Sequence, residues 1–346
     1  MRKIKVLVVE DSYMFRGVLV NGLKSDPGIE VVATANDPFE ARDMIIKHNP
    51  DVMTLDVEMP KMDGIEFLRK LMPQHPMPVV MVSSLNSKVF DALNAGAVDF
   101  VNKPSGLTKE QLGDFIKNEL ITKVKIASTV KISNLKKTKN GDNTQGQQEE
   151  GSVYDKKVLA IGASTGGTEA IYSVLTRLNS DIPGIVITQH MPPGFTKMFA
   201  DRLNNQTRLN VKEAATGDII KPGHVLIAPG DKQMKVVKVG NMYKVECFNG
   251  PKVSGHCPSV DVLFESVALA CKQDAVGVIL TGMGADGAKG LLKMKQSGAY
   301  TIGQDESSCI VYGMPKVAME LGAVGYQVSL DKIPEKIYTL LTRNSS

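Results

Sequence analysis

The sequence has no tryptophan, few aromatic residues and no C-x-x-C pair among its four cysteines. Free thiols without that spacing disfavour a redox motif and are typical of a reducing compartment, although Cys247, His256 and Cys257 leave a zinc site open. There is no signal peptide, and no apolar run approaches the ~18 residues of a membrane span. A net charge of +4 is too small to predict nucleic-acid binding. We therefore expect a cytoplasmic protein without a transmembrane segment.

Apolar runs alternate with helical patterns in the N-terminal third of the chain. The clearest strand-like runs are 5–9, 51–55, 78–82 and 99–102, with a helical pattern at 39–46 between the first two. Such alternation is typical of a doubly wound α/β domain with a parallel sheet, here of five strands.

Polar side chains follow these runs at the point where each strand should end. Glu10, Asp11 and Asp56 are acids, Ser83 is a hydroxyl and Lys103 is a base. Clustered carboxylates repel one another unless a hard cation neutralises them, and Mg²⁺ prefers oxygen ligands. A carboxylate beside Mg²⁺ and a lysine can accept a phosphoryl group, because that transfer needs mainly positioning and charge neutralisation.

A second chemical motif begins after the apolar run 158–161. The segment 162–167 spells G-A-S-T-G-G, and a helical pattern follows it. Ser164 is thus predicted at a sharp strand-to-helix turn, where a hydroxyl is exposed beside free helix N–H groups. The alternative is a tight glycine turn with an incidental serine.

A serine nucleophile needs a base, and the base needs a partner that orients it. His190 ends the run 184–189, and Asp286 follows the run 276–281. Side chains past the carboxyl ends of parallel strands line one crevice, so Ser164, His190 and Asp286 are predicted to meet there.

The segment 282–287 also spells G-x-G-x-x-G between a strand and a helix, with Asp305 further along the chain. That pattern is typical of dinucleotide binding and remains an alternative for the C-terminal domain. Against it, Asp286 would put a negative charge beside a pyrophosphate, and Ser164 and His190 would have no role.

Taken together, the motifs identify two family resemblances. Residues 1–122 resemble a response-regulator receiver domain through L-D-V-E-M-P-x-M-D-G. Residues 153–346 resemble the catalytic domain of chemotaxis protein-glutamate methylesterases through G-A-S-T-G-G, Q-H-M-P and T-G-M-G-A-D-G. Residues 123–152 form a polar segment that we expect to be a flexible linker, the first part of which could continue the last receiver helix.

The resemblance implies a mostly parallel, Rossmann-like sheet for the catalytic domain. Within it, 211–248 is expected to insert short, hairpin-like strands, including the segment 218–230. In the receiver, the stretch between Ser84 and Gly96 is shorter than usual in the family and predicts a short fourth helix. Lys103–Pro104 is expected to be a cis peptide bond.

The family's roles transfer to particular residues. Ser164 resembles the nucleophile, His190 the general base and Asp286 its orienting partner, with the Met283 N–H as oxyanion donor and Thr165 in the same pocket. The receiver residues implied are the phosphoacceptor Asp56, the Mg²⁺ ligands Glu10, Asp11, Asp56 and Glu58 (through its carbonyl), and the switch residues Ser83, Phe100 and Lys103.

The implied function is a phosphorylation-activated serine esterase. It would hydrolyse glutamate methyl esters on chemoreceptors, release methanol and need no cofactor for that reaction, with deamidation of receptor glutamines left open. Its partners would be a chemotaxis histidine kinase as phosphodonor and the chemoreceptors as substrate, and the protein would be a monomer. The competing function is an adaptor whose receiver signals through an inactive or dinucleotide-binding output domain.

Overall fold

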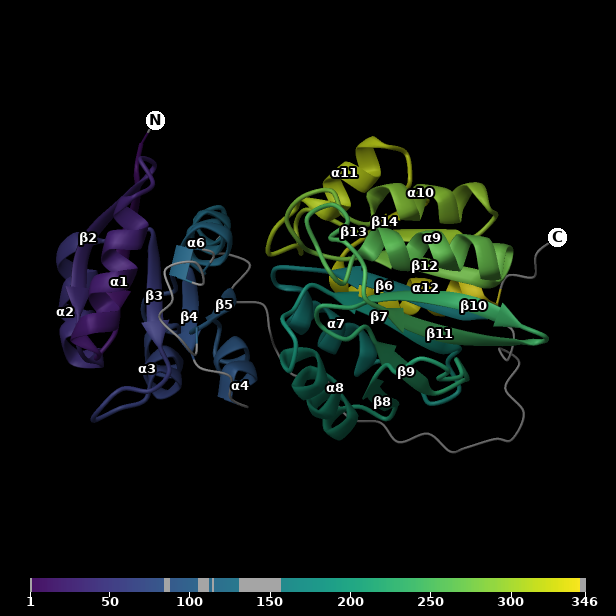
Figure 1. The fold of residues 1–346 in the computed structure, drawn as a ribbon, viewed down its shortest axis with the longest axis horizontal. Helices are drawn as coiled ribbons and strands as arrows, with labels where there is room; N and C mark the ends of the chain where they lie inside the picture. The colour runs from purple at the N-terminus through teal and green to yellow at the C-terminus, as the bar shows by residue number, and fades with distance from the viewer. Residues whose placement is uncertain (1, 84–87, 105–111, 114, 131–156, 343–346) are drawn as a thin grey trace. The chain divides into compact units, whose positions relative to one another are not determined.

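Residues 2–83, 88–104, 112–113, 115–130 and 157–342 are described by the structure, a computed structural model. The chain divides into two units, Met1–Thr138 and Lys139–Ser346. Each unit has its own sheet (Figure 1).

The first unit is built on a five-stranded parallel sheet with the order β2-β1-β3-β4-β5. The strands are β1 (Ile4–Val9), β2 (Ile29–Ala35), β3 (Val52–Asp56), β4 (Val79–Ser83) and β5 (Asp99–Asn102). The helices between them are α1 (Tyr13–Lys24), α2 (Pro38–His48), α3 (Gly64–Leu71) and the short α4 (Lys88–Asn94). β3 and β4 are buried along their whole length, as central strands covered on both faces should be. The doubly wound sheet predicted from the sequence is confirmed.

Short polar side chains begin the helices of this unit. Ser12 caps α1 and Asp63 caps α3, while Asp37 accepts hydrogen bonds from the N–H groups of Phe39 and Glu40 at the start of α2. Each cap satisfies backbone donors that have no partner inside the helix. These caps fix the loops at the carboxyl edge of the sheet, where the predicted acids lie.

The last helical segments of the first unit extend past the predicted domain boundary. A π-helical segment, η1 (Phe115–Leu120), leads into α6 (Ile121–Ala127), and Val124 is buried in this unit. Lys123 pairs with Asp99 at 2.8 Å. The first residues expected in the linker are therefore helical, whereas 131–156 lie outside the described residues. The flexible linker stays a prediction.

The second unit contains a seven-stranded sheet with the order β14-β13-β12-β6-β7-β9-β8, and all its pairings are parallel. Its strands are β6 (Val158–Ala163), β7 (Gly184–Gln189), β8 (Asn210–Glu213), β9 (His224–Ile227), β12 (Ala275–Ile279), β13 (Tyr300–Gln304) and β14 (Tyr326–Val328). After β6 the chain adds strands on one side, and from β12 onward on the other. The strand order therefore reverses between β6 and β12, which is where ligand crevices form in such sheets.

Helices cover both faces of this sheet. They are α7 (Gly167–Leu175), α8 (Phe195–Gln206), α9 (Val260–Cys271), α10 (Ala288–Gln296), α11 (Met314–Glu320) and α12 (Ile333–Leu341), with short 3₁₀ segments η3 (Lys272–Asp274) and η4 (Leu330–Lys332). Figure 1 shows α9 and α10 side by side in front of the sheet and α12 behind it.

The segment 211–248 folds partly as predicted. β10 (Gln233–Val239) and β11 (Met242–Phe248) form an antiparallel hairpin that packs on α9. The assignment of 218–230 to hairpin-like strands was wrong for 224–227, because β9 pairs in parallel with β7 and β8 and so belongs to the main sheet. Alternation of apolar and polar residues does not distinguish an edge strand of a parallel sheet from a hairpin strand.

Candidate active site

Three neighbouring strand ends of the second unit converge on one edge of its sheet. β6 lies between β12 and β7, and Ala163 is in register with Gln189. The Ser164 N–H donates to the Thr281 carbonyl at 3.0 Å, and the His190 N–H donates to the Ala163 carbonyl at 3.2 Å. The segments that carry the predicted nucleophile, base and carboxylate are thus tied together by backbone hydrogen bonds.

Ser164 lies on a sharp turn between β6 and α7. The Gly167 N–H closes this turn by donating to the Ser164 carbonyl at 2.7 Å, and Gly166 has a φ of 75°, which favours glycine. A Cβ on Gly282 would lie 2.7 Å from the Cβ of Ser164, so only glycine lets the loop after β12 approach so closely. Ser164 itself is half-buried and remains accessible to a substrate.

His190 and Asp286 are in direct contact. The Nε2 atom of His190 lies 2.7 Å from Oδ2 of Asp286, and both side chains are buried. Asp286 also accepts hydrogen bonds from the Ser259 hydroxyl at 2.7 Å, the Val260 N–H at 2.7 Å and the Asp261 N–H at 3.0 Å. Val260 and Asp261 open α9, so the carboxylate sits at a helix N-terminus, which favours negative charge.

These donors keep Asp286 ionised. Burial alone would raise the pKa of Asp286, but the hydrogen bond and charge of His190, with the hydrogen bonds of Ser259 and Val260, outweigh it and hold the pKa below 3.8. An ionised carboxylate only accepts hydrogen bonds, so Nε2 of His190 must carry the proton. In the neutral imidazole the lone pair is then on Nδ1, and this atom is buried without a hydrogen-bond partner among the described residues. The contact with Asp286 therefore favours the neutral tautomer with its proton on Nε2.

Gln189 holds the serine turn and the histidine together. Its Nε2 donates to the Ser164 carbonyl at 2.9 Å and to the His190 carbonyl at 3.2 Å. The residue is buried at the end of β7. One amide thus fixes the backbone on both sides of the site, a role that the sequence did not reveal.

Of the two predicted pocket residues, Thr165 lies in the serine turn and Met283 lies in the loop after β12. Thr165 is buried, and its carbonyl accepts from the Thr281 hydroxyl at 3.0 Å. Met283 follows Gly282 and is 48% exposed. The loop that carries Met283 therefore borders Ser164 and is open to solvent.

A second histidine, which the sequence did not identify as part of the site, lies against the first. The rings of His190 and His256 stack with centroids 3.7 Å apart and an angle of 10° between their planes. Burial, with the charges of His190 and Lys252, lowers the pKa of His256 to about 4 although Asp286 opposes this shift. His256 is therefore neutral at physiological pH. The sequence offered His256 only as a possible zinc ligand beside Cys247 and Cys257.

The first unit brings the predicted receiver acids together. Ligand oxygens of Glu10, Asp11 and Asp56 all lie within 4.8 Å of one another. Lys103 Nζ lies 2.6 Å from Oδ2 of Asp56 and 3.0 Å from Oε2 of Glu10. Glu10 and Asp56 are buried, whereas Asp11 is exposed at the mouth of the cluster.

Burial and neighbouring charges shift the pKa values of the carboxylates in this cluster. Burial, with the charge of Asp56, raises the pKa of Glu10 to about 7, and burial raises the pKa of Asp56 above 3.8 despite Lys103. One lysine cannot neutralise three carboxylates, and Oε2 of Glu10 has the ion pair with Lys103 but no hydrogen bond that meets the geometry of one among the described residues. The donor set therefore fits a divalent cation with oxygen ligands.

The remaining receiver residues surround this cluster. The Glu58 N–H donates to Oδ1 of Asp56 at 3.2 Å, and the Lys103 N–H donates to the Ser83 carbonyl at 2.7 Å. Phe100 is buried on β5, which pairs with β4. The expected cis bond at Lys103–Pro104 was wrong, since the cis peptide bond of the described residues is Cys257–Pro258.

The alternative sites find no support in the second unit. Asp286 points its oxygens at His190 and the start of α9, and Asp305 accepts from the N–H and hydroxyl of Ser308 in its own turn. Both carboxylates therefore accept hydrogen bonds from neighbouring protein groups, and these bonds have no role in binding a dinucleotide. Among the described residues, the group that could hold a metal ion is formed by Glu10, Asp11 and Asp56. Neither Cys247 nor Cys257 is part of such a group.

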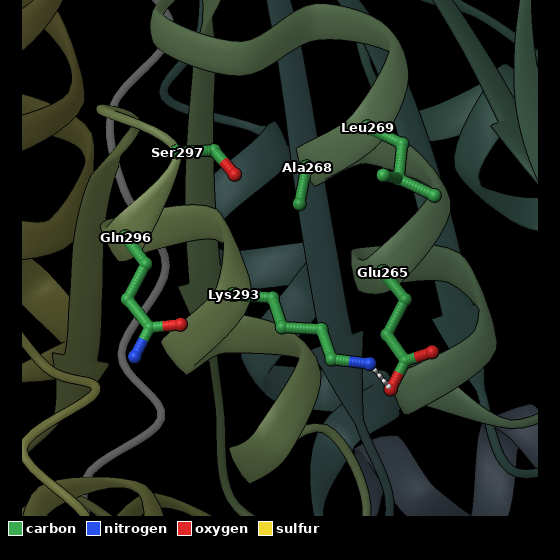
Figure 2. Close-up of a pocket in the computed structure, with 6 residues that line it drawn as sticks. All are labelled: Glu265, Ala268, Leu269, Lys293, Gln296 and Ser297. Carbon is green, nitrogen blue, oxygen red and sulfur yellow. Dashed lines mark ion pairs between the residues drawn. The ribbon is translucent and has the colours of Figure 1, made fainter.

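A surface pocket lies away from the strand ends, between α9 and α10 (Figure 2). It is lined by Glu265, Ala268, Leu269, Lys293, Gln296 and Ser297. Lys293 Nζ and Glu265 Oε1 form an ion pair at 2.7 Å across it. None of the predicted site residues lines this pocket.

Known proteins resemble the chain in both units. Family models described as CheB methylesterase and response regulator receiver domain match residues 159–337 and 6–116. The protein-glutamate methylesterase/protein-glutamine glutaminase 2 of Syntrophomonas wolfei is 56% identical over 99% of each chain, and the corresponding Salmonella typhi protein is 49% identical over 97% of each. The solved catalytic domain of Thermotoga maritima CheB methylesterase has a TM-score of 0.52 and 40% identity, and covers 53% of this chain and 98% of that one. The chain therefore belongs to the CheB methylesterase family, with a receiver domain ahead of the methylesterase domain.

Proposed function

We propose that this protein hydrolyses glutamate methyl esters on chemoreceptors and releases methanol, under the control of phosphorylation of its receiver domain. The observation that carries the proposal is the 2.7 Å contact between Nε2 of His190 and Asp286, at the sheet edge that also carries Ser164. Asp286 engages Nε2, whereas Nδ1 is buried without a partner among the described residues, and the backbone of His190 is hydrogen-bonded to Ala163, next to Ser164. The names of its relatives, protein-glutamate methylesterase/protein-glutamine glutaminase, support the same chemistry.

In the first half-reaction, the Ser164 hydroxyl attacks the ester carbonyl while Nδ1 of His190 takes its proton. Asp286 stabilises the imidazolium that forms, without taking the proton itself. The N–H of Met283 donates to the developing oxyanion. The carbon–oxygen bond to the methoxy group then breaks, and His190 returns the proton so that methanol leaves.

The second half-reaction repeats these steps with water. His190 takes a proton from water as the water attacks the acyl group on Ser164, and the proton then returns to Ser164. The products are a free glutamate and the original enzyme. A glutamine amide would follow the same path with ammonia as the leaving group, so we extend the proposal to deamidation, in line with the relatives' names.

We assign phosphoryl acceptance to Asp56. Glu10, Asp11 and Asp56, with the Glu58 carbonyl, would hold Mg²⁺, which supplies positive charge for the transferring phosphoryl group. Lys103, already 2.6 Å from Asp56, is available to pair with the phosphoryl oxygens. Ser83 and Phe100 are the switch residues that would respond to the new charge.

The partners follow from these two chemistries. A chemotaxis histidine kinase would supply the phosphoryl group, and chemoreceptors would supply the esters. No helix among the described residues is long and apolar enough to cross a membrane. We assign the protein to the cytoplasm, as a monomer that binds no nucleic acid. The adaptor alternative is not favoured, because it leaves the His190–Asp286 pair without a role.

The test is methanol release by the purified full chain. Receptor-containing membranes carrying radiolabelled methyl esters would be incubated with the protein, with and without acetyl phosphate and Mg²⁺. The proposal predicts release above the membrane blank and more release with the phosphodonor. Release equal to the blank under both conditions would contradict it.

A further inference from the structure

His256 covers one face of the His190 imidazole. The two rings are nearly parallel, at 10°, and their centroids are 3.7 Å apart. The hydrogen bond from Nε2 to Asp286 and the covalent bond at Cγ hold two points of the His190 ring, but they leave rotation about the axis through these points free. A flat neighbour at van der Waals distance removes that rotation, because tilting the ring would drive it into the stacked one.

A rigid turn holds His256 in this place. The N–H groups and carbonyls of Val253 and His256 exchange two hydrogen bonds of 2.9 Å, across Ser254 with φ 51° and Gly255 with φ 85°. The buried Gln233 also donates to the His256 carbonyl at 3.3 Å. His256 is therefore anchored through its backbone.

The same segment also builds the support of Asp286. Three residues after His256, the Ser259 N–H donates to Oε1 of Gln233 at 2.9 Å. Ser259 and Val260 then donate to Asp286. The segment from His256 to Val260, which Gln233 holds by hydrogen bonds, thus contacts both the ring of His190 and the carboxylate of Asp286.

Building on the proposed function, we infer that His256 is a positioning residue for hydrolysis. It keeps the His190 ring in the plane in which Nε2 faces Asp286 and Nδ1 is free for Ser164, and it shields that face of the ring from water. Its flat shape performs this role, and its nitrogen atoms do not take part in proton transfer. The low pKa of His256 agrees with this role, because a stacked cation would oppose the imidazolium formed during catalysis.

Two variants separate stacking from imidazole chemistry. His256→Phe keeps a flat ring, whereas His256→Leu fills the volume without one. We expect His256→Leu to lower kcat for methanol release about 10- to 100-fold with KM changed less than about twofold, because a misplaced base affects the chemical step. His256→Phe should stay within about threefold of the unaltered kcat. The control His224→Ala, at the start of β9, removes a half-buried histidine of the same unit and should leave kcat unchanged.

A second measurement does not depend on esterase activity. Nitrogen-15 NMR of the histidine-labelled full chain reports the tautomer of His190, identified by loss of its signals in His190→Gln. The unaltered protein and His256→Phe should show the Nε2–H tautomer, and His256→Leu should show mixed or exchange-broadened signals.

The outcomes separate the two proposals. Absence of methanol release by the unaltered protein contradicts the proposed function but leaves the tautomer measurement able to test His256. Normal kcat and an unchanged His190 tautomer in His256→Leu would overturn the positioning role. A His256→Phe variant as slow as His256→Leu would also overturn it, because the imidazole itself would then be required. If circular dichroism shows that His256→Leu is unfolded, the His256→Phe result alone decides.

Discussion

One oxygen of Asp286 lies 2.7 Å from Nε2 of His190, at the N-terminus of α9. The backbone donors of that helix end, together with the Ser259 hydroxyl, occupy the acceptor sites that water would otherwise take. The carboxylate is buried, and these donors hold its pKa below 3.8, so it is ionised at neutral pH. Because it cannot give up these bonds, it fixes the tautomer of His190 before any substrate arrives.

Replacing Asp286 by asparagine removes the carboxylate that fixes the tautomer of His190. Asp286→Asn should lower kcat about 1,000- to 10,000-fold, because an amide can donate to Nε2 and so favour the tautomer with the proton on Nδ1. The matched control is Asp305→Asn, which changes the acid of the dinucleotide alternative and should keep kcat near its original value. Steady-state methanol release measures both. A large loss in Asp305→Asn with little loss in Asp286→Asn would contradict the assignment.

Gln189→Glu tests whether the side chain of Gln189 holds the backbone at Ser164 and at His190 together. The change removes the amide that donates to the Ser164 and His190 carbonyls and adds a buried acid beside them. We expect a loss of about 1–3 kcal/mol in unfolding free energy and a lower kcat. Denaturant unfolding and methanol release measure these effects. Gln296→Glu, an exposed change in the same unit, should alter neither, and equal behaviour of the two variants would show that Gln189 is not a tie.

Asp56→Asn should abolish phosphorylation of the receiver and the rise in activity that accompanies it. The physical reason is that Asp56 is the buried carboxylate closest to Lys103, whereas asparagine cannot form an acyl phosphate. Intact-mass measurement after acetyl phosphate and Mg²⁺ checks the first effect, and methanol release checks the second. The exposed change Asp43→Asn is the control. A mass increase that persists in Asp56→Asn would assign the phosphoryl group to another residue.

His256 should make the stability of the protein depend on pH. Its pKa is about 4 in the folded protein, whereas an unperturbed histidine has a pKa of 6.5, so between these values the unfolded chain binds more protons. The free energy of unfolding is therefore not reduced by His256 above about pH 6.5. It falls by on the order of 2–3 kcal/mol as the pH drops from 6.5 towards 4, because the unfolded chain takes up the proton first. Thermal unfolding of the full chain at several pH values should show a shallower acid loss in His256→Phe than in the control His75→Phe. Equal slopes would contradict a buried neutral His256.

The fold and the strand-end residues could be predicted because both follow from local patterns. Ser164, His190 and Asp286 each follow an apolar run, and the carboxyl ends of parallel strands meet at one edge. The receiver acids obey the same rule. The roles of these residues remain predictions, whereas the doubly wound sheets are confirmed.

Residues whose importance depends on packing could not be predicted in this way. His256 reaches His190 from a turn in a loop, and nothing in its local sequence indicates which ring it will cover. Gln189 looks like an ordinary strand residue until the positions of two backbone carbonyls are known. Strand 224–227 was misassigned because its short alternating pattern does not specify its partner.

The central claim is that Ser164 is the nucleophile of an esterase, and Ser164→Ala tests it most directly. The variant removes only a hydroxyl from a half-buried turn, so the fold should survive, as circular dichroism can verify. Methanol release from methylated receptors by the full chain should fall to the membrane blank in Ser164→Ala, while the unaltered protein releases methanol under the same conditions. Turnover by folded Ser164→Ala close to that of the unaltered protein would contradict the account.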